Sequence, residues 1–108
     1  MGGVLREGEP SVSEMPKLYD VFEPPKMKSV RAVTKMREQL DIREVFARVP
    51  KVQKITTSKK TVAKFHLRRS CYLLLFPTGY VEIHAPDEGS VREVMVSFRD
   101  ELYKSGLL

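Results

Sequence analysis

Cysteine and tryptophan are nearly missing from this sequence, which has a single cysteine, Cys71, and no tryptophan. One cysteine cannot form a disulfide within the chain, so a disulfide-stabilised scaffold is excluded. Cys71 lies in an apolar stretch and is expected to be a buried thiol. The chain has no run of about 18 apolar residues, so no segment is expected to span a membrane. The N-terminus lacks the apolar segment of a secretion signal, which favours a cytoplasmic protein.

Residues that support catalysis are also scarce. The sequence has two histidines, His66 and His84, no glycine-rich phosphate loop after a strand, and no obvious base beside Cys71. Glu82 is not expected to complete a metal site with the histidines, because the side chains at 82 and 84 of one strand are expected to sit about 7 Å apart. We therefore expect no enzyme, no catalytic residue, no metal and no cofactor, and assign the histidines a binding or structural role.

Positive charge is what the sequence has in excess, and it is concentrated in the middle. Residues 26–69 hold 14 lysines and arginines against three acids, a net charge of +11, whereas residues 1–25 and 70–108 each carry −3. This asymmetry indicates an anionic partner, with nucleic acid as the first candidate. The alternative is a solvated lysine-rich surface of the kind common in thermophiles.

The first 27 residues are expected to form a flexible N-terminal arm. Four prolines and three glycines interrupt this segment, and no period of two or 3.6 is sustained in it. A small apolar cluster lies within the arm and is expected to pack either on its own domain or on a protein partner. The cluster consists of Leu18, Tyr19, Val21 and Phe22.

Two amphipathic helices are expected in the remaining domain, residues 28–108. Asp41 begins a capping-box pattern for a helix over 42–49, which Pro50 ends. Ser90 begins a similar pattern for a helix over 91–105. Both helices carry apolar residues on one face, as helices that cover a sheet do.

Five strands complete the expected domain, over residues 28–35, 51–56 and 62–67 and within a hairpin at 71–84. Pro77 and Gly79 mark the hairpin turn. After the turn, Val81 and Ile83 alternate with Glu82 and His84, a period that gives one buried and one open face. The expected fold is α+β: a five-stranded antiparallel sheet in the order β-α-β-β-β-β-α, with both helices on one face and the other face open.

Three local patterns, together with this order of elements, resemble one repeat of the TATA-box-binding protein family. Leu40-Asp41-Ile42-Arg43-Glu44-Val45 resembles the family's leucine-aspartate start of its first helix. Val49-Pro50-Lys51-Val52 resembles its proline-containing passage into the second strand, and Leu73-Leu74-Leu75-Phe76-Pro77-Thr78-Gly79 resembles its hairpin. The match runs from about Ser29 to Lys104.

The resemblance implies a curved half-saddle that binds the DNA minor groove in transcription or chromatin. The family's saddle has two repeats and this chain has room for one, so we expect a symmetric homodimer that joins strand edges into a ten-stranded saddle. Phe76 aligns with a phenylalanine that intercalates between base steps. The alternation of side chains between the two sheet faces, together with this resemblance, gives the expected nucleic-acid-binding residues. They are Arg31, Val33, Lys35, Lys59, Lys60, Lys64, His66, Arg68, Tyr72, Leu74, Phe76 and His84.

Three departures from the family pattern leave the partner open. The second wedging phenylalanine falls near Lys59 or Lys60, Arg31 replaces a groove-reading asparagine, and Glu82 replaces a small apolar contact and is expected to repel phosphate. The alternatives are DNA of another specificity, structured RNA, or a protein partner. In the last case the chain is an adaptor that uses its sheet face and its N-terminal arm.

Overall fold

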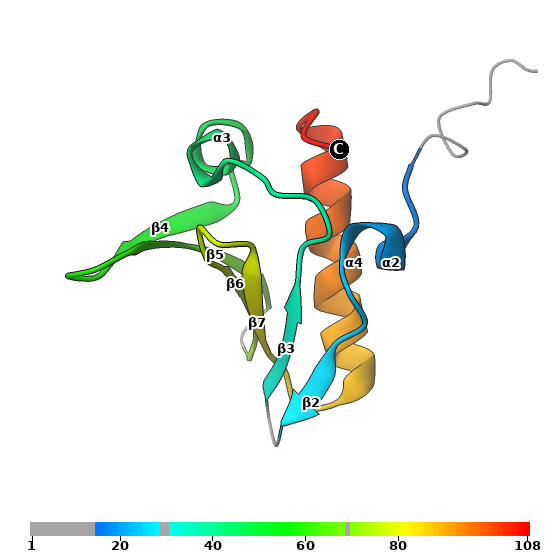
Figure 1. Ribbon diagram of the computed structural model, residues 1–108. Coiled ribbons are helices and arrows are strands. Elements are labelled where there is room, and N and C mark those ends of the chain that lie inside the picture. Colours follow the sequence, from blue (N-terminus) through cyan, green and yellow to red (C-terminus); the bar gives the residue numbers. More distant parts are fainter. Residues whose placement is uncertain (1–14, 29–30, 69) are drawn as a thin grey trace, which may run out of the picture.

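The computed structural model describes residues 15–28, 31–68 and 70–108 and shows an α+β fold (Figure 1). An open, antiparallel, six-stranded sheet has the strand order β2-β3-β7-β6-β5-β4. The strands are β2 Lys26–Lys28, β3 Arg31–Lys35, β4 Val52–Thr56, β5 Thr61–Arg68, β6 Cys71–Leu75 and β7 Tyr80–His84. The helices are α2 Leu18–Val21, α3 Ile42–Arg48 and α4 Glu88–Lys104.

The sixth strand and the third helix come from the segment that the sequence assigns to a flexible arm. Leu18, Val21 and Phe22 are buried, and the rings of Phe22 and Phe98 lie 6.5 Å apart. β2 pairs antiparallel with β3. The expected five-stranded sheet is therefore wrong by one strand, because apolar burial of the cluster holds this segment against the domain. The remainder of the expected arm, residues 1–14, lies outside the described residues.

The α4 helix begins three residues before the expected start. Asp87 is its N-cap, with extended backbone (φ −154°) and a side-chain oxygen that accepts from the Ser90 amide at 2.8 Å. Ser90, the expected cap, lies inside the first turn. A carboxylate suits the positive end of the helix dipole better than a hydroxyl does. The α3 helix has the expected cap, because Asp41 accepts from the Arg43 amide.

The hairpin predicted over residues 71–84 is confirmed. The Phe76 amide donates to the Tyr80 carbonyl and the Gly79 amide to the Phe76 carbonyl, each at 2.9 Å. Gly79 has a φ of +93°, a conformation that favours glycine in a turn. The β6–β7 register then pairs Leu73 with Ile83 and Leu75 with Val81.

One face of the sheet carries the core. The α4 helix packs on β5, β6 and β7, and α3 packs on β4 and β5. Val81 and Ile83 are fully buried and Cys71 is nearly so, as expected from the sequence. The helix-side cluster centres on Phe98, whose ring lies 5.3 Å from that of Phe65. In the described parts of the chain, no helix is both long and apolar enough to cross a membrane.

Candidate nucleic-acid interface

The sheet face opposite α4 collects most of the residues that the sequence assigns to nucleic-acid binding. Paired strands place Arg31, His84, Tyr72 and His66 in one row across the sheet, and Val33, Glu82, Leu74 and Lys64 in the next. We call this surface the open face. Its residues are Lys26, Lys28, Arg31, Val33, Lys35, Gln53, Ile55, Val62, Lys64, His66, Tyr72, Leu74, Phe76, Tyr80, Glu82 and His84.

Aromatic rings from three strands meet in the centre of the open face. The Tyr72 and His84 rings are stacked, with centroids 4.5 Å apart and planes 10° apart. The His66 ring lies 5.5 Å from Tyr72 on the other side. The Lys64 ammonium sits 4.3 Å above the centroid of the Tyr72 ring, a cation–π contact. A positive charge is thus held directly on a flat aromatic platform.

Glu82 is an acid among these cations, and the nearby Arg31 guanidinium offsets its charge. The Glu82 Oε1 atom lies 3.4 Å from His84 Nε2 and 3.9 Å from an Arg31 guanidinium nitrogen. The expected 7 Å separation of the side chains at 82 and 84 is therefore wrong for their ends, which meet because both side chains bend toward each other along the strand. Even so, the described residues contain no group of three histidine, cysteine or acidic side chains that could hold a metal ion.

A second group of rings lies at the turn of the β6–β7 hairpin. The Phe76 and Tyr80 centroids are 5.4 Å apart, with planes tilted by 56°, and the Lys60 ammonium lies 5.3 Å from the Phe76 centroid. These residues line a hollow of about 570 Å³ together with Lys59, Thr78 and Glu82. Phe76 is half-buried, so it forms part of the wall of this hollow.

Lys26 and Lys28 add two cations that the expected set of binding residues does not contain. Lys26 pairs with Val33 and Lys28 with Arg31, so both lysines extend the open face beyond β3, and both are exposed. The signal in the sequence is the alternation Lys26-Met27-Lys28, with the central methionine against the core. The expected set of binding residues also omits Tyr80, although Tyr80 alternates with Val81 on the same strand.

Arg68 is the one expected binding residue that the structure directs toward the helices. The β5–β6 register shifts between His66 and Arg68, and Arg68 then pairs with Cys71, which is buried on the helix side. Its guanidinium forms an ion pair with Glu93 of α4, and this hydrogen bond raises the pKa of Arg68 further above its usual value. A one-residue bulge reverses the side on which all later residues point.

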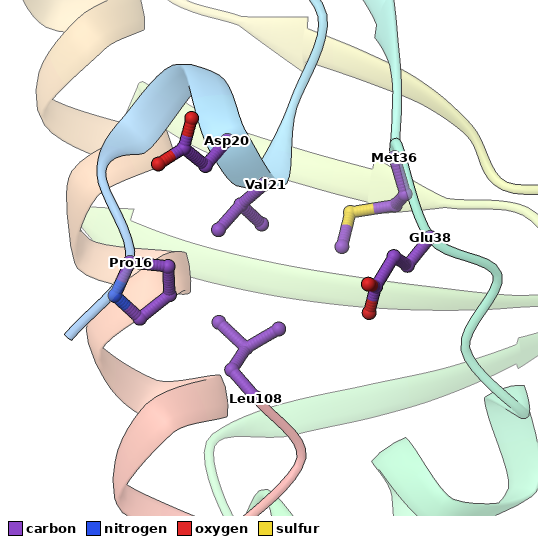
Figure 2. A pocket seen from close by; sticks show the side chains of 6 residues that line it. All are labelled: Pro16, Asp20, Val21, Met36, Glu38 and Leu108. Carbon is purple, nitrogen blue, oxygen red and sulfur yellow. The ribbon is translucent and has the colours of Figure 1, made fainter. Parts of the chain in front are cut away.

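A separate pocket of about 320 Å³ lies among α2, the residues after β3 and Leu108. Figure 2 shows Val21, Met36 and Leu108 pointing into this pocket, with Asp20 and Glu38 at its sides. It shares no lining residue with the open face. Its acidic sides also suit a cationic group rather than a phosphate.

Comparison with known proteins assigns no family and no function to the chain. No family model matches the chain, and neither the curated proteins nor the solved structures contain a significant match.

Proposed function

We propose that the open face binds nucleic acid. The observation that carries this proposal is the placement of seven cationic or aromatic side chains in adjacent rows of one sheet face that α3 and α4 leave uncovered. Cations neutralise phosphates and release counterions, and flat rings contact bases or sugars. The basic residues are Lys26, Lys28, Arg31, Lys35 and Lys64, and the central rings are those of Tyr72 and Phe76.

Duplex DNA, bound in the minor groove, is the partner that the resemblance to the TATA-box-binding protein family favours. The elements from β3 to α4 keep the order strand, helix, four strands, helix, on which that resemblance rests. The Arg31 guanidinium lies 3.9 Å from Glu82 and reduces the repulsion between this acid and phosphate. More specifically, we propose that the half-saddle binds DNA in transcription or chromatin.

The test is a binding titration of the full chain with a labelled AT-rich duplex, a GC-rich duplex and a structured RNA across a salt series. Minor-groove binding predicts a preference for the AT-rich duplex and a loss of affinity as salt rises. Phe76→Ala should then reduce DNA bending, measured by energy transfer between dyes at the duplex ends. Equal, salt-dependent binding to all three would indicate a non-specific basic surface.

A protein-interaction adaptor is the second candidate, and one observation favours it. Val33, Leu74 and Val62 place apolar side chains on the open face, and Ile55 beside them is 36% exposed. An apolar strip of this kind is typical of protein contacts. The adaptor is favoured over the nucleic-acid proposal if the purified chain ignores all three nucleic acids at low salt.

A further inference from the structure

The hollow beside the β6–β7 turn has the size and the lining of a site for one flat, polar ring. Its volume of about 570 Å³ falls within the range of small-molecule sites. Its walls come from two segments that are separated in the sequence: the β4–β5 turn, and the β6–β7 turn with the start of β7. The residues that the argument uses are Lys59, Lys60, Phe76, Tyr80 and Glu82.

The turns on both sides of the hollow are ordered by their own hydrogen bonds. Phe76 is fixed by the bonds from its amide to Tyr80 and from Gly79 to its carbonyl. In the β4–β5 turn, the Thr57 hydroxyl accepts a hydrogen bond from the Lys60 amide and donates one to the Lys60 carbonyl, each at 3.1 Å. The backbone on both sides of the hollow is therefore held in place, which lowers the entropic cost of binding.

Three kinds of group converge on this space. Phe76 and Tyr80 offer aromatic surface, and Lys59 and Lys60 offer positive charge at the rim. Glu82 also lines the hollow; its Oε1 atom lies beside His84 and Arg31, so its second carboxylate oxygen is the acceptor that it offers. A ligand that matches all three has a flat ring, an attached anion and an N–H donor on the ring edge. A nucleotide with an amino group on its base has these features, because its base stacks, its phosphate is anionic and the amino group donates.

We propose that this hollow binds a single unpaired base of a nucleic-acid strand and prefers cytosine to thymine. The proposal rests on the proposed binding of nucleic acid by the open face, and it names a single-stranded segment in place of a duplex as what enters this hollow. Glu82 accepts from the cytosine amino group, whereas thymine presents an oxygen acceptor at the same position. The base must be unpaired because stacking within a duplex covers both of its faces.

Tyr80 connects this hollow to a second, smaller one. The second hollow has a volume of about 150 Å³ and is lined by Tyr80, Val33 and Lys35, among others. A strand whose base enters the first hollow can pass over Tyr80 toward Lys35, with its phosphates near lysines at both ends. Successive contacts of this kind are typical of single-strand binding, in which aromatic and basic residues alternate along the path.

The test uses the full chain and four labelled ten-nucleotide strands at neutral pH and low salt, with binding followed by fluorescence anisotropy. The strands are all-cytosine DNA, all-thymine DNA, all-cytosine RNA and an abasic DNA strand that keeps the phosphates. We expect the cytosine DNA to bind about tenfold more tightly than the abasic strand, with the thymine strand between them. The RNA distinguishes the two sources of an unpaired base: equal affinity supports recognition of the base alone, and tighter binding supports RNA as the source.

Two substitutions connect the preference to this hollow. Phe76→Leu keeps an apolar side chain but removes the aromatic surface, so the ratio of cytosine to abasic affinity should fall about tenfold. Phe46→Leu is its matched control, because Phe46 is also covered by a lysine, with Lys54 Nζ 5.7 Å from its ring, but lies on α3. Glu82→Gln should abolish the cytosine preference, since an amide both donates and accepts hydrogen bonds.

The outcomes separate this inference from the function on which it rests. If all strands bind in a salt-dependent way and the abasic strand binds as tightly as the cytosine strand, the base site is overturned and the proposed function stands. A cytosine preference that survives Phe76→Leu and Glu82→Gln would also overturn it. No binding of any strand or duplex at low salt would overturn both proposals together.

Discussion

At the scale of single residues, the local charge near the middle of the open face depends on the surroundings of Glu82. From the sequence alone, an acid at this position is expected to repel phosphate. In the structure, the Glu82 carboxylate lies beside the Arg31 guanidinium and the His84 ring. Arg31 therefore has two roles: it attracts phosphate and it offsets the charge of Glu82. Lys64, which sits over the Tyr72 ring, has only the first role.

This difference predicts unequal effects of two alanine substitutions. Lys64→Ala and Arg31→Ala should each lower the salt dependence of DNA binding by about one unit of slope. Arg31→Ala should cost more affinity at a given salt concentration, because it leaves Glu82 without its guanidinium partner. The measurement is a salt series by fluorescence anisotropy. Lys54→Ala is the control, since Lys54 lies on the helix side of β4 over Phe46, and an equal loss in that variant would contradict an open-face site.

On the open face, the sequence predicts the direction of most side chains but not of all. Alternation along β7, together with the family resemblance at Phe76, was sufficient to place Tyr72, Leu74 and His84 on the face away from the helices. Arg68 was misplaced because alternation cannot anticipate a β-bulge, which moves every later side chain to the other face. The expected 7 Å separation of the Glu82 and His84 side chains is also wrong, because spacing along a strand fixes backbone atoms and not the ends of side chains.

At the scale of secondary-structure elements, the start of α4 depends on which of two suitable N-cap residues the chain uses. Asp87 and Ser90 both suit an N-cap, and only Asp87 has the extended backbone that the position requires. The segment before residue 28 was harder to predict, because its prolines obscure any period. Its burial depends on long-range contacts with α4 and β3, which no local pattern encodes.

The Asp87 cap predicts a specific dependence of stability on pH. The hydrogen bond from the Ser90 amide holds the pKa of Asp87 below its usual value of 3.8. Because this pKa is lower in the folded than in the unfolded protein, the carboxylate stabilises the fold fully above about pH 4, and this contribution is lost as the pH falls through the folded pKa. Asp87→Ala should lower the thermal midpoint by about 5 °C at neutral pH, with a smaller difference in acid.

Asp87→Asn is the control for that experiment, measured by thermal unfolding at several pH values. Asparagine keeps an acceptor for the Ser90 amide but does not titrate, so this variant should retain most of the cap at every pH. If Asp87→Ala and the parent differ by the same amount in acid as at neutral pH, the charge of Asp87 has no part in capping α4.

The packing of α2 predicts that the N-terminal segment stabilises the whole domain. Phe22 is fully buried and contacts the ring of Phe98. Phe22→Ala should therefore lower the free energy of unfolding by about 3–5 kcal/mol, a large part of the stability of a domain this size. Chemical denaturation provides the measurement. Tyr19→Ala serves as a control within α2, which Phe22 directly follows, because Tyr19 is 41% exposed; an equally small loss in both variants would contradict the packing of this segment.

At the scale of the whole molecule, the structure changes how two copies can associate. The sequence predicts a homodimer joined through strand edges into a ten-stranded saddle. In the structure, β2 covers the outer edge of β3, so the two ends of the sheet are β2 and β4. β2 has three residues and two of them are lysines, a composition that blunts strand edges. β4 has five residues, four of them exposed, and is the better edge for pairing.

We therefore predict a symmetric dimer joined antiparallel through β4, with a continuous sheet of twice six strands. The two open faces would then form one longer basic surface, which suits an extended anionic partner better than one face does. Ile55 is 36% exposed on this edge, and Ile55→Lys would bring two like charges together near the two-fold axis. Sedimentation velocity at micromolar concentration should show a dimer for the parent and for Tyr19→Lys, the matched exposed position, and a monomer for Ile55→Lys. A monomeric parent would exclude this dimer and leave the open face of one chain as the complete binding surface.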